Sequence, residues 1–330
     1  MFDKEFDDKI EVDEKNIKEI DANINYCEEE EKVDDKVDDK VKVVEIKKID
    51  IKKVLDYDTL VISGGSSTGI VTLGSLQYAY DNYFLNKVQT YIGTSSGGII
   101  CYLLIIGYSP IEIIVYICSH QLMEKIQHFN IVAMINGGGA SSFNTIYEQL
   151  EKMTIDKIGF LPTFEDLKNK YGKTLICTTY NTTENKTEYI SYLTKPTLPC
   201  LIGLKMSSNL PLIFEKYKYG NNFYIDGGVS DNFPIDIGDK MGDKVLGIVL
   251  SSKDENFNNE HEMNILEYIY KLMFIPISQT EEHKIENVSD KCKIIKLYYS
   301  KIKFFNFNIN SKMKLDLFSS GYEQTKNIFE

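Results

Sequence analysis

The hydrophobic pattern changes at residue 55, and from there short apolar runs alternate with longer amphipathic stretches up to the C-terminus. Apolar runs rich in β-branched residues predict buried strands, and apolar residues spaced by three or four predict helices. The predicted strands cover residues 59–63, 88–92, 174–179, 187–192, 219–225, 245–250 and 294–298. The predicted helices cover residues 70–84, 99–106, 110–122, 143–153, 162–167 and 265–273, and a last one ends at 329. This alternation predicts an α/β fold with three layers (α/β/α), in which helices cover both faces of a mostly parallel central sheet.

The first part of the chain lacks this pattern. Residues 1–50 carry 19 acidic residues and 10 lysines, so they hold most of the net charge of −12. A segment with dense charge and few large apolar side chains cannot bury enough surface to fold by itself. The sequence therefore predicts an acidic, disordered tail over residues 1–52 and one domain over residues 53–330. A partner-binding arm is the alternative for the tail, and its partner is unknown.

Composition narrows the classes of function. The domain is close to neutral, which argues against nucleic-acid binding, and no cofactor or metal motif is present. No apolar segment follows the charged N-terminus, so we expect no signal peptide, and no apolar run is long enough to span a bilayer. The six cysteines form no C-x-x-C pair and are expected to be free thiols. Together these features predict an intracellular protein, either cytoplasmic or peripheral to membranes.

A G-x-S-x-G motif formed by Gly93, Ser95 and Gly97 lies between a predicted strand and a predicted helix. This context is typical of a nucleophile elbow, in which a serine stands at the tip of a tight turn. The neighbours must be small because the strand and the helix approach closely and a substrate must reach the hydroxyl. The helix also directs its N-terminal N–H groups toward the site where negative charge develops. The motif alone recurs by chance, but its flanks favour Ser95 as a nucleophile.

A glycine-rich stretch, Gly64-Gly65-Ser66-Ser67-Thr68-Gly69, directly follows the first predicted strand. Such a turn can present backbone N–H groups in a concave array, which suits the oxyanion of an acyl-transfer intermediate. The candidate oxyanion-hole residues are Gly64, Gly65, Ser66 and Gly69. A dinucleotide-binding turn is the alternative, but the G-x-G-x-x-G spacing is not met.

A carboxylate that could accept the serine proton is found much later, in Asp226-Gly227-Gly228. The two glycines leave room around the carboxylate of Asp226. An ordinary turn would explain the same three residues equally well. The functional interpretation gains weight from the order in which the glycine-rich stretch, the elbow and this aspartate occur.

That order resembles the patatin-like phospholipase family. The family has a glycine-rich oxyanion loop after its first strand, then a G-x-S-x-G elbow, and much later a D-G-G or D-G-A aspartate. Here these are Gly64–Gly69, Gly93–Gly97 and Asp226–Gly228, and Asp231–Pro234 also matches the family's continuation. The resemblance covers roughly residues 58–250.

The resemblance implies a Ser–Asp dyad without histidine. Ser95 would attack the ester carbonyl of a phospholipid or related lipid at a membrane or micelle surface, and Asp226 would take its proton. No metal or cofactor is implied. A Ser–His–Asp hydrolase that uses His261 or His283 remains an alternative on residue order alone.

The glycine-rich loop departs from the family pattern G-G-G-x-[KR]-G at two positions. Ser66 replaces the third glycine, where a positive φ would favour glycine, and Thr68 replaces the basic residue. From these departures we expect that a lysine at position 68 raises activity by adding positive charge near the oxyanion. They also leave open a catalytically weakened lipid- or protein-binding module.

Overall fold

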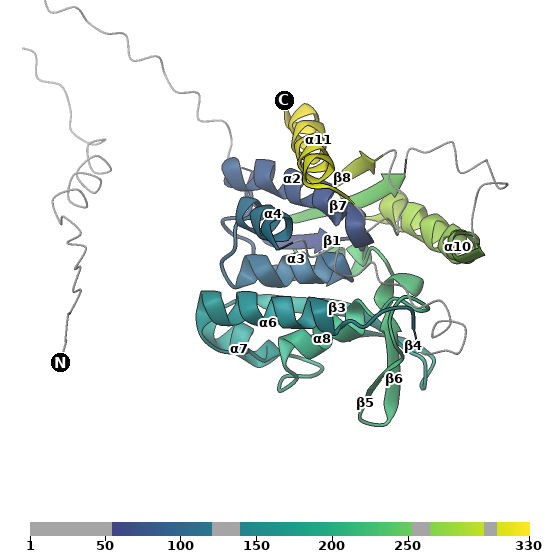
Figure 1. Ribbon diagram of the computed structural model, residues 1–330. Coiled ribbons are helices and arrows are strands. Elements are labelled where there is room, and N and C mark those ends of the chain that lie inside the picture. Colours follow the sequence, from purple (N-terminus) through teal and green to yellow (C-terminus); the bar gives the residue numbers. More distant parts are fainter. Residues whose placement is uncertain (1–54, 121–138, 253–264, 300–308) are drawn as a thin grey trace, which may run out of the picture. The chain divides into compact units, whose positions relative to one another are not determined.

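The computed structural model describes residues 55–120, 139–252, 265–299 and 309–330 (Figure 1). The predicted N-terminal tail, residues 1–52, lies outside the described residues, so its disorder stays a prediction. The predicted domain is described from Leu55 onward.

The described residues form one eight-stranded sheet with the strand order β5-β6-β3-β2-β1-β7-β8, and β4 pairs with β3 outside this path. The strands are β1 (Thr59–Ile62), β2 (Thr90–Thr94), β3 (Thr174–Asn181), β4 (Lys186–Ile190), β5 (Tyr217–Tyr219), β6 (Asn222–Asp226), β7 (Val245–Ser252) and β8 (Cys292–Tyr299). Strands β3, β2, β1, β7 and β8 run parallel, whereas β4, β5 and β6 pair antiparallel. The sheet is therefore mostly parallel, as predicted.

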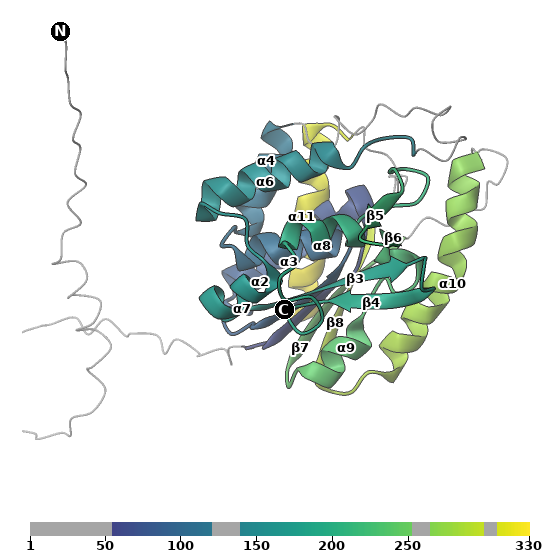
Figure 2. The ribbon, with the colours of Figure 1, turned by 90° about the horizontal axis from the view of Figure 1, so that it is seen from below.

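Helices cover both faces of this sheet (Figure 2). The α-helices are α2 (Gly69–Asp81), α3 (Ser96–Ile105), α4 (Pro110–Ser119), α6 (Asn144–Ile158), α7 (Phe164–Tyr171), α8 (Cys200–Ser207), α9 (Ile235–Met241), α10 (Ile265–Asn287) and α11 (Ser311–Phe329). Side chains alternate across a strand. Leu60 and Ile62 of β1 therefore pack into the core with α2, α3 and α11, while Val61 packs into a second core with α9 and α10. The three-layer α/β/α fold is confirmed.

Several elements differ from their predicted form, each for a local reason. The short helices α8 and α9 were not predicted, and α8 is buried on most sides, which removes its amphipathic period. Helix α10 runs to Asn287 through Pro276, a residue that usually ends a helix. The strand predicted at 219–225 is a hairpin, β5–β6, that turns at Gly220 with φ 59°. Leu122, predicted in the helix that became α4, lies outside the described residues.

Helices α2 and α11 touch backbone to backbone. A Cβ atom on Gly74 would lie 1.8 Å from the carbonyl oxygen of Phe318, and one on Gly321 would lie 1.9 Å from that of Val71. Next to this contact Thr325 Oγ1 donates a hydrogen bond to Ser75 Oγ at 2.7 Å. The C-terminal helix thus holds the helix that directly follows the glycine-rich loop.

Two predictions made from composition can be compared with the described residues. Cys101, Cys118, Cys177, Cys200 and Cys292 are free thiols, as expected. In this part of the chain no single helix has the length and apolarity needed to cross a membrane, although α3 and α4 together do, bent by 118° where they meet.

Candidate active site

Ser95 forms the turn between β2 and α3 with φ 55° and ψ −125°. This conformation is unfavourable for a residue with a side chain, by about 1–3 kcal/mol, and such residues cluster at functional sites. The flanking glycines allow the turn to form. A Cβ atom on Gly93 would lie 2.5 Å from the backbone of Gly97, and one on Gly97 would lie 2.5 Å from the carbonyl oxygen of Ile62. The chain therefore has the tight strand–turn–helix geometry that the motif predicts.

Helix α8 supports this turn from the side. The backbone N–H of Ser95 donates to Ser207 Oγ at 3.0 Å, and the Ser95 residue is only 7% exposed. Ser207 was not among the predicted site residues, because the helix that carries it was not predicted. Its hydroxyl helps hold the elbow in place.

Asp226 ends β6 and is buried beside the Ser95 hydroxyl. Its Oδ1 accepts a hydrogen bond from the backbone N–H of Gly228 at 2.7 Å. Burial raises the pKa of Asp226 to about 6, while hydrogen bonding from Ser95 and from the Gly228 amide lowers it. Its other oxygen, Oδ2, is buried and has no hydrogen-bond partner among the described residues. A carboxylate with one open oxygen next to a serine hydroxyl is suited to accept its proton.

The glycine-rich loop directs its amides differently from the prediction. The N–H of Gly64 donates to the Asn232 carbonyl at 3.1 Å, that of Gly65 to Ser96 Oγ at 3.1 Å, and that of Gly69 to the Ser66 carbonyl. Three of the four expected oxyanion donors are therefore engaged within the protein in this conformation. The reason is local, since Ser96 and Asn232 supply acceptors that the loop sequence does not reveal.

Ser66, the fourth expected donor, has φ 47°, the left-handed conformation that glycine adopts without strain. Its Oγ is buried and has no hydrogen-bond partner among the described residues. The expectation that this position needs a positive φ is therefore confirmed. The serine side chain is strained and unsatisfied where the family pattern has glycine.

Thr68 corrects another expectation. The expected gain from a lysine at this position requires room for a long charged side chain, but Thr68 is 0% exposed. Its Oγ1 donates to the Gly65 carbonyl at 2.6 Å and so closes the loop on itself. A lysine would lose this bond and bring a charge into the interior. The physical argument for a gain in activity is therefore wrong.

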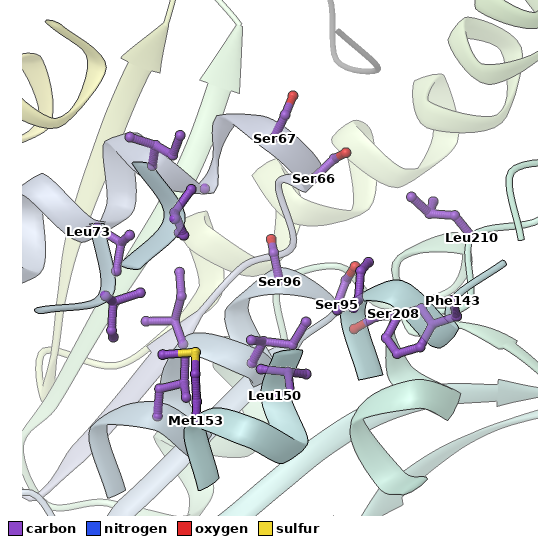
Figure 3. A pocket seen from close by; sticks show the side chains of 18 of the residues that line it. Ser66, Ser67, Leu73, Ser95, Ser96, Phe143, Leu150, Met153, Ser208 and Leu210 are labelled. Atoms are coloured by element: carbon purple, nitrogen blue, oxygen red, sulfur yellow. The ribbon is translucent and has the colours of Figure 1, made fainter. Parts of the chain in front are cut away.

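An apolar cavity of about 140 Å³ opens beside the elbow (Figure 3). Its walls are mostly aliphatic side chains from α2, α3, α4 and α6. Ser95 and Ser208 lie toward one side of the view, and Leu73 and Met153 lie toward the other. A second, much smaller cavity of about 10 Å³ is lined by Asp226, the glycine-rich loop, Tyr270 and Phe274. Ser95, Ser66 and Leu210 line both cavities, so the serine stands where they meet.

The histidines within the described part of the chain take no part in this arrangement. His283 is exposed on α10, where its ring contacts Asn287, and His261 lies outside the described residues. Within the described ranges no histidine lines either cavity. The described part of the chain therefore offers no support for a Ser–His–Asp triad.

A family model described as patatin-like phospholipase matches residues 60–239, more than half of the chain. The chain belongs to the patatin-like phospholipase family. The matched residues contain the elbow, the glycine-rich loop and Asp226. Elements α10, β8 and α11 lie after the matched segment in the sequence.

Two curated viral proteins are similar in sequence. The chain is 41% identical over 191 residues to "Probable lipid hydrolase 463L" of Invertebrate iridescent virus 6, a match that covers 57% of this chain. The match spans 65% of that relative, just under two thirds of its length. The chain is also 28% identical over 280 residues to "Uncharacterized protein R571" of Acanthamoeba polyphaga mimivirus, covering 81% of this chain and 92% of that protein.

Solved structures are similar at lower identity. VipD from Legionella pneumophila matches 82% of this chain and 66% of its own, with a TM-score of 0.48 and 15% identity. The type III effector protein ExoU matches 82% of this chain and 52% of its own, with a TM-score of 0.40 and 12% identity. Human GIVD cytosolic phospholipase A2 matches 58% of this chain and 42% of its own, with a TM-score of 0.35 and 10% identity.

Proposed function

We propose that this patatin-like protein is a lipid acyl hydrolase that cleaves carboxylic esters of phospholipids or related lipids. One observation carries the proposal: Ser95 lies where a small cavity holding a buried carboxylate meets a larger cavity of aliphatic side chains. A serine beside a proton acceptor suits acyl transfer, and the aliphatic cavity suits an acyl chain. Family membership and the viral relative named as a probable lipid hydrolase support the same reaction class.

In this mechanism Asp226 accepts the proton of the Ser95 hydroxyl as Oγ forms a bond to the ester carbonyl carbon. The tetrahedral intermediate collapses when the bond to the leaving alcohol breaks, and that alcohol takes the proton from Asp226. Water then gives a proton to Asp226 as it attacks the acyl-enzyme. The bond to Ser95 Oγ breaks, Oγ takes the proton back from Asp226, and the fatty acid is released. With a pKa of about 6, most Asp226 side chains are ionised at neutral pH and can act as the base.

The oxyanion of this intermediate needs hydrogen-bond donors. We assign the Ser66 amide to it first, because the amides of Gly64, Gly65 and Gly69 donate within the protein. The Gly65 amide can join when the Ser96 hydroxyl, its present acceptor, turns away. Helix α3 begins directly after Ser95, and its N-terminus adds a favourable potential for negative charge.

The apolar cavity would hold one acyl chain of the substrate. Each methylene group moved from water into such a cavity contributes about 0.8 kcal/mol. A lipid in a membrane or micelle must leave the neighbouring lipids before its acyl chain can enter the cavity. Burial of the chain in the cavity offsets the loss of its contacts with those lipids. The proposed substrate is therefore a lipid ester at an interface, and no metal or cofactor enters the reaction.

The test measures hydrolysis of phospholipids, lysophospholipids, acylglycerols and short p-nitrophenyl esters by the wild type and by Ser95→Ala. Ser119→Ala, a substitution at an exposed serine on α4, is the matched control. We expect hydrolysis of at least one lipid class, loss of it in Ser95→Ala and no loss in Ser119→Ala. Hydrolysis that persists in Ser95→Ala would exclude the proposed nucleophile.

The second candidate function is a lipid- or protein-binding module without catalysis. It is favoured by the three loop amides that already donate within the protein and by the strained Ser66. A fluorophosphonate probe separates the two functions, because it labels only an activated serine. Labelling of the wild type but not of Ser95→Ala supports the hydrolase, and absence of labelling together with lipid binding supports the module.

A further inference from the structure

Asn232 joins the two loops that flank Ser95. Its backbone carbonyl accepts the Gly64 N–H at 3.1 Å, and its Nδ2 donates to the Gly64 carbonyl at 3.4 Å. The packing is tight, since a Cβ atom on Gly64 would lie 2.3 Å from Asn232 Oδ1. Asn232 lies one short turn after Asp226 in the sequence. It therefore connects the loop that follows Asp226 to the start of the glycine-rich loop.

Helix α10 holds Asn232 from the other side. Asn232 Nδ2 donates to Glu281 Oε1 at 2.8 Å, a shorter bond than the one to Gly64. Nearby on α10, Lys284 Nζ lies 2.7 Å from Asp231 Oδ1 and 2.6 Å from Asp236 Oδ1. The helix is therefore fixed to the chain on both sides of Asn232. This helix follows the part of the chain that matches the family model.

The position of Glu281 is energetically unfavourable for an ionised carboxylate. Burial, together with the neighbouring Asp231, raises its pKa to about 7, although the hydrogen bond from Asn232 and the charge of Lys284 act to lower it. Removing a carboxylate from water is unfavourable unless its partners compensate. Perturbed acids of this kind are found more often at functional sites than elsewhere. The direct contact of Glu281 is with Asn232, which indicates a role exerted through that residue.

We propose that Glu281 is a positioning residue that fixes the Gly64 peptide through Asn232 and so sets the glycine-rich loop beside Ser95. The carboxylate holds the Asn232 amide group in one orientation. In that orientation Nδ2 reaches the Gly64 carbonyl and the Asn232 backbone accepts the Gly64 N–H. The importance of the loop for the reaction rests on the proposed function, but the positioning itself does not.

The experiment compares Glu281→Leu with Glu281→Gln, because the two side chains are similar in size and only glutamine keeps an oxygen that accepts from Asn232. Glu286→Leu, the same substitution at an exposed position of α10, is the control. Hydrogen exchange of a peptide covering residues 62–69 reports the order of the loop, and kcat and KM are measured separately. Asn232→Ala and its combination with Glu281→Leu test whether the two residues act as one unit.

We expect Glu281→Leu to speed exchange in residues 62–69 and to lower kcat by about tenfold, the effect of one lost hydrogen bond to a charged group, with KM nearly unchanged. Glu281→Gln should recover most of both losses, Glu286→Leu should show neither, and the double variant should be no worse than Asn232→Ala alone. Exchange and kcat of Glu281→Leu equal to the wild type would overturn the proposal. Equal losses in the leucine and glutamine variants would also overturn it.

The two proposals fail separately. If the wild type hydrolyses no ester, the proposed function is wrong, but the exchange comparison still decides whether Glu281 orders the loop. If the wild type is active and Glu281→Leu changes neither exchange nor kcat, only the positioning role is lost.

Discussion

Ser95 and Asp226 are held beside each other by two consecutive residues of β3. Thr178 pairs with Thr94, the residue before the serine, and Thr179 pairs with Asp226 itself. The two strands that carry the pair meet end to end along one edge of β3, because β4 occupies the other edge; β2 runs parallel to β3 and β6 runs antiparallel to it. The spacing of the pair is therefore set by the hydrogen-bond ladder of the sheet.

Removing either member of this pair should have nearly the same effect as removing both. Ser95→Ala and Asp226→Asn should each lower kcat/KM for ester hydrolysis by roughly a thousandfold or more, because nucleophile and base act in one step. The double variant should lose little more. Steady-state kinetics with thermal unfolding as the folding check measures this, and an Asp226→Asn variant with most of its activity would contradict the dyad.

Asp226→Asn should also change how stability depends on pH. Burial raises the pKa of the native carboxyl to about 6, above its ordinary value of 3.8. The stabilising contribution of a raised acid is present at pH values below the unfolded pKa and is lost as pH rises through the folded pKa. Asparagine does not titrate, so the stability of the variant relative to the wild type should rise by about 2 to 3 kcal/mol between pH 4 and pH 7. Urea unfolding at several pH values tests this, and a constant difference would contradict it.

Thr68→Lys should lower both stability and activity. The position is buried, and the Thr68 hydroxyl bonds the Gly65 carbonyl, so lysine would lose that bond and bury an ammonium group. Thr68→Ser should be mild because it keeps the hydroxyl, and Thr68→Val should cost about 1 kcal/mol for the lost bond. Unfolding free energies and kcat/KM of the three variants decide this. A higher kcat/KM in Thr68→Lys would restore the charge argument.

Ser66→Gly should stabilise the protein by about 1 kcal/mol, since it relieves a left-handed backbone and removes a buried, unsatisfied hydroxyl. Ser67→Gly is the matched comparison. It changes the next residue of the same short helix, where φ is not positive, and should destabilise. Denaturant unfolding of both variants gives the answer. Destabilisation by both substitutions would mean that chain entropy outweighs the strain at Ser66.

Met153→Phe should shorten the acyl chain that the protein accepts. Met153 lines the apolar cavity on the side away from Ser95 in Figure 3, so a larger side chain there takes the place of the end of a long chain. The ratio of kcat/KM for long over short esters should fall by about fourfold for each methylene displaced. Met241→Phe, at an exposed position, should leave the ratio unchanged. An unchanged ratio in Met153→Phe would place the acyl chain elsewhere.

The sequence could predict the three-layer fold, because strands and helices have strong local signals. The pairing of Ser95 with Asp226 was predicted from the order of the motifs and the family resemblance, because each motif alone is a weak signal. The sequence could not predict the direction of the loop amides. The acceptors of Gly64 and Gly65 are Asn232 and Ser96, which lie far away in sequence. It also could not identify Glu281, a single acidic residue within a helix, whose surroundings exist only after folding.

The contact of Gly74 with α11 has a consequence for how the chain can be shortened. The segment that matches the family model ends before β8 and α11, yet the backbone of α2 at Gly74 packs directly against the backbone of α11. The proposed site residues lie within residues 60–239, but we expect this segment not to fold independently, and a gain of bulk at either Gly74 or Gly321 should act like a truncation of the C-terminus.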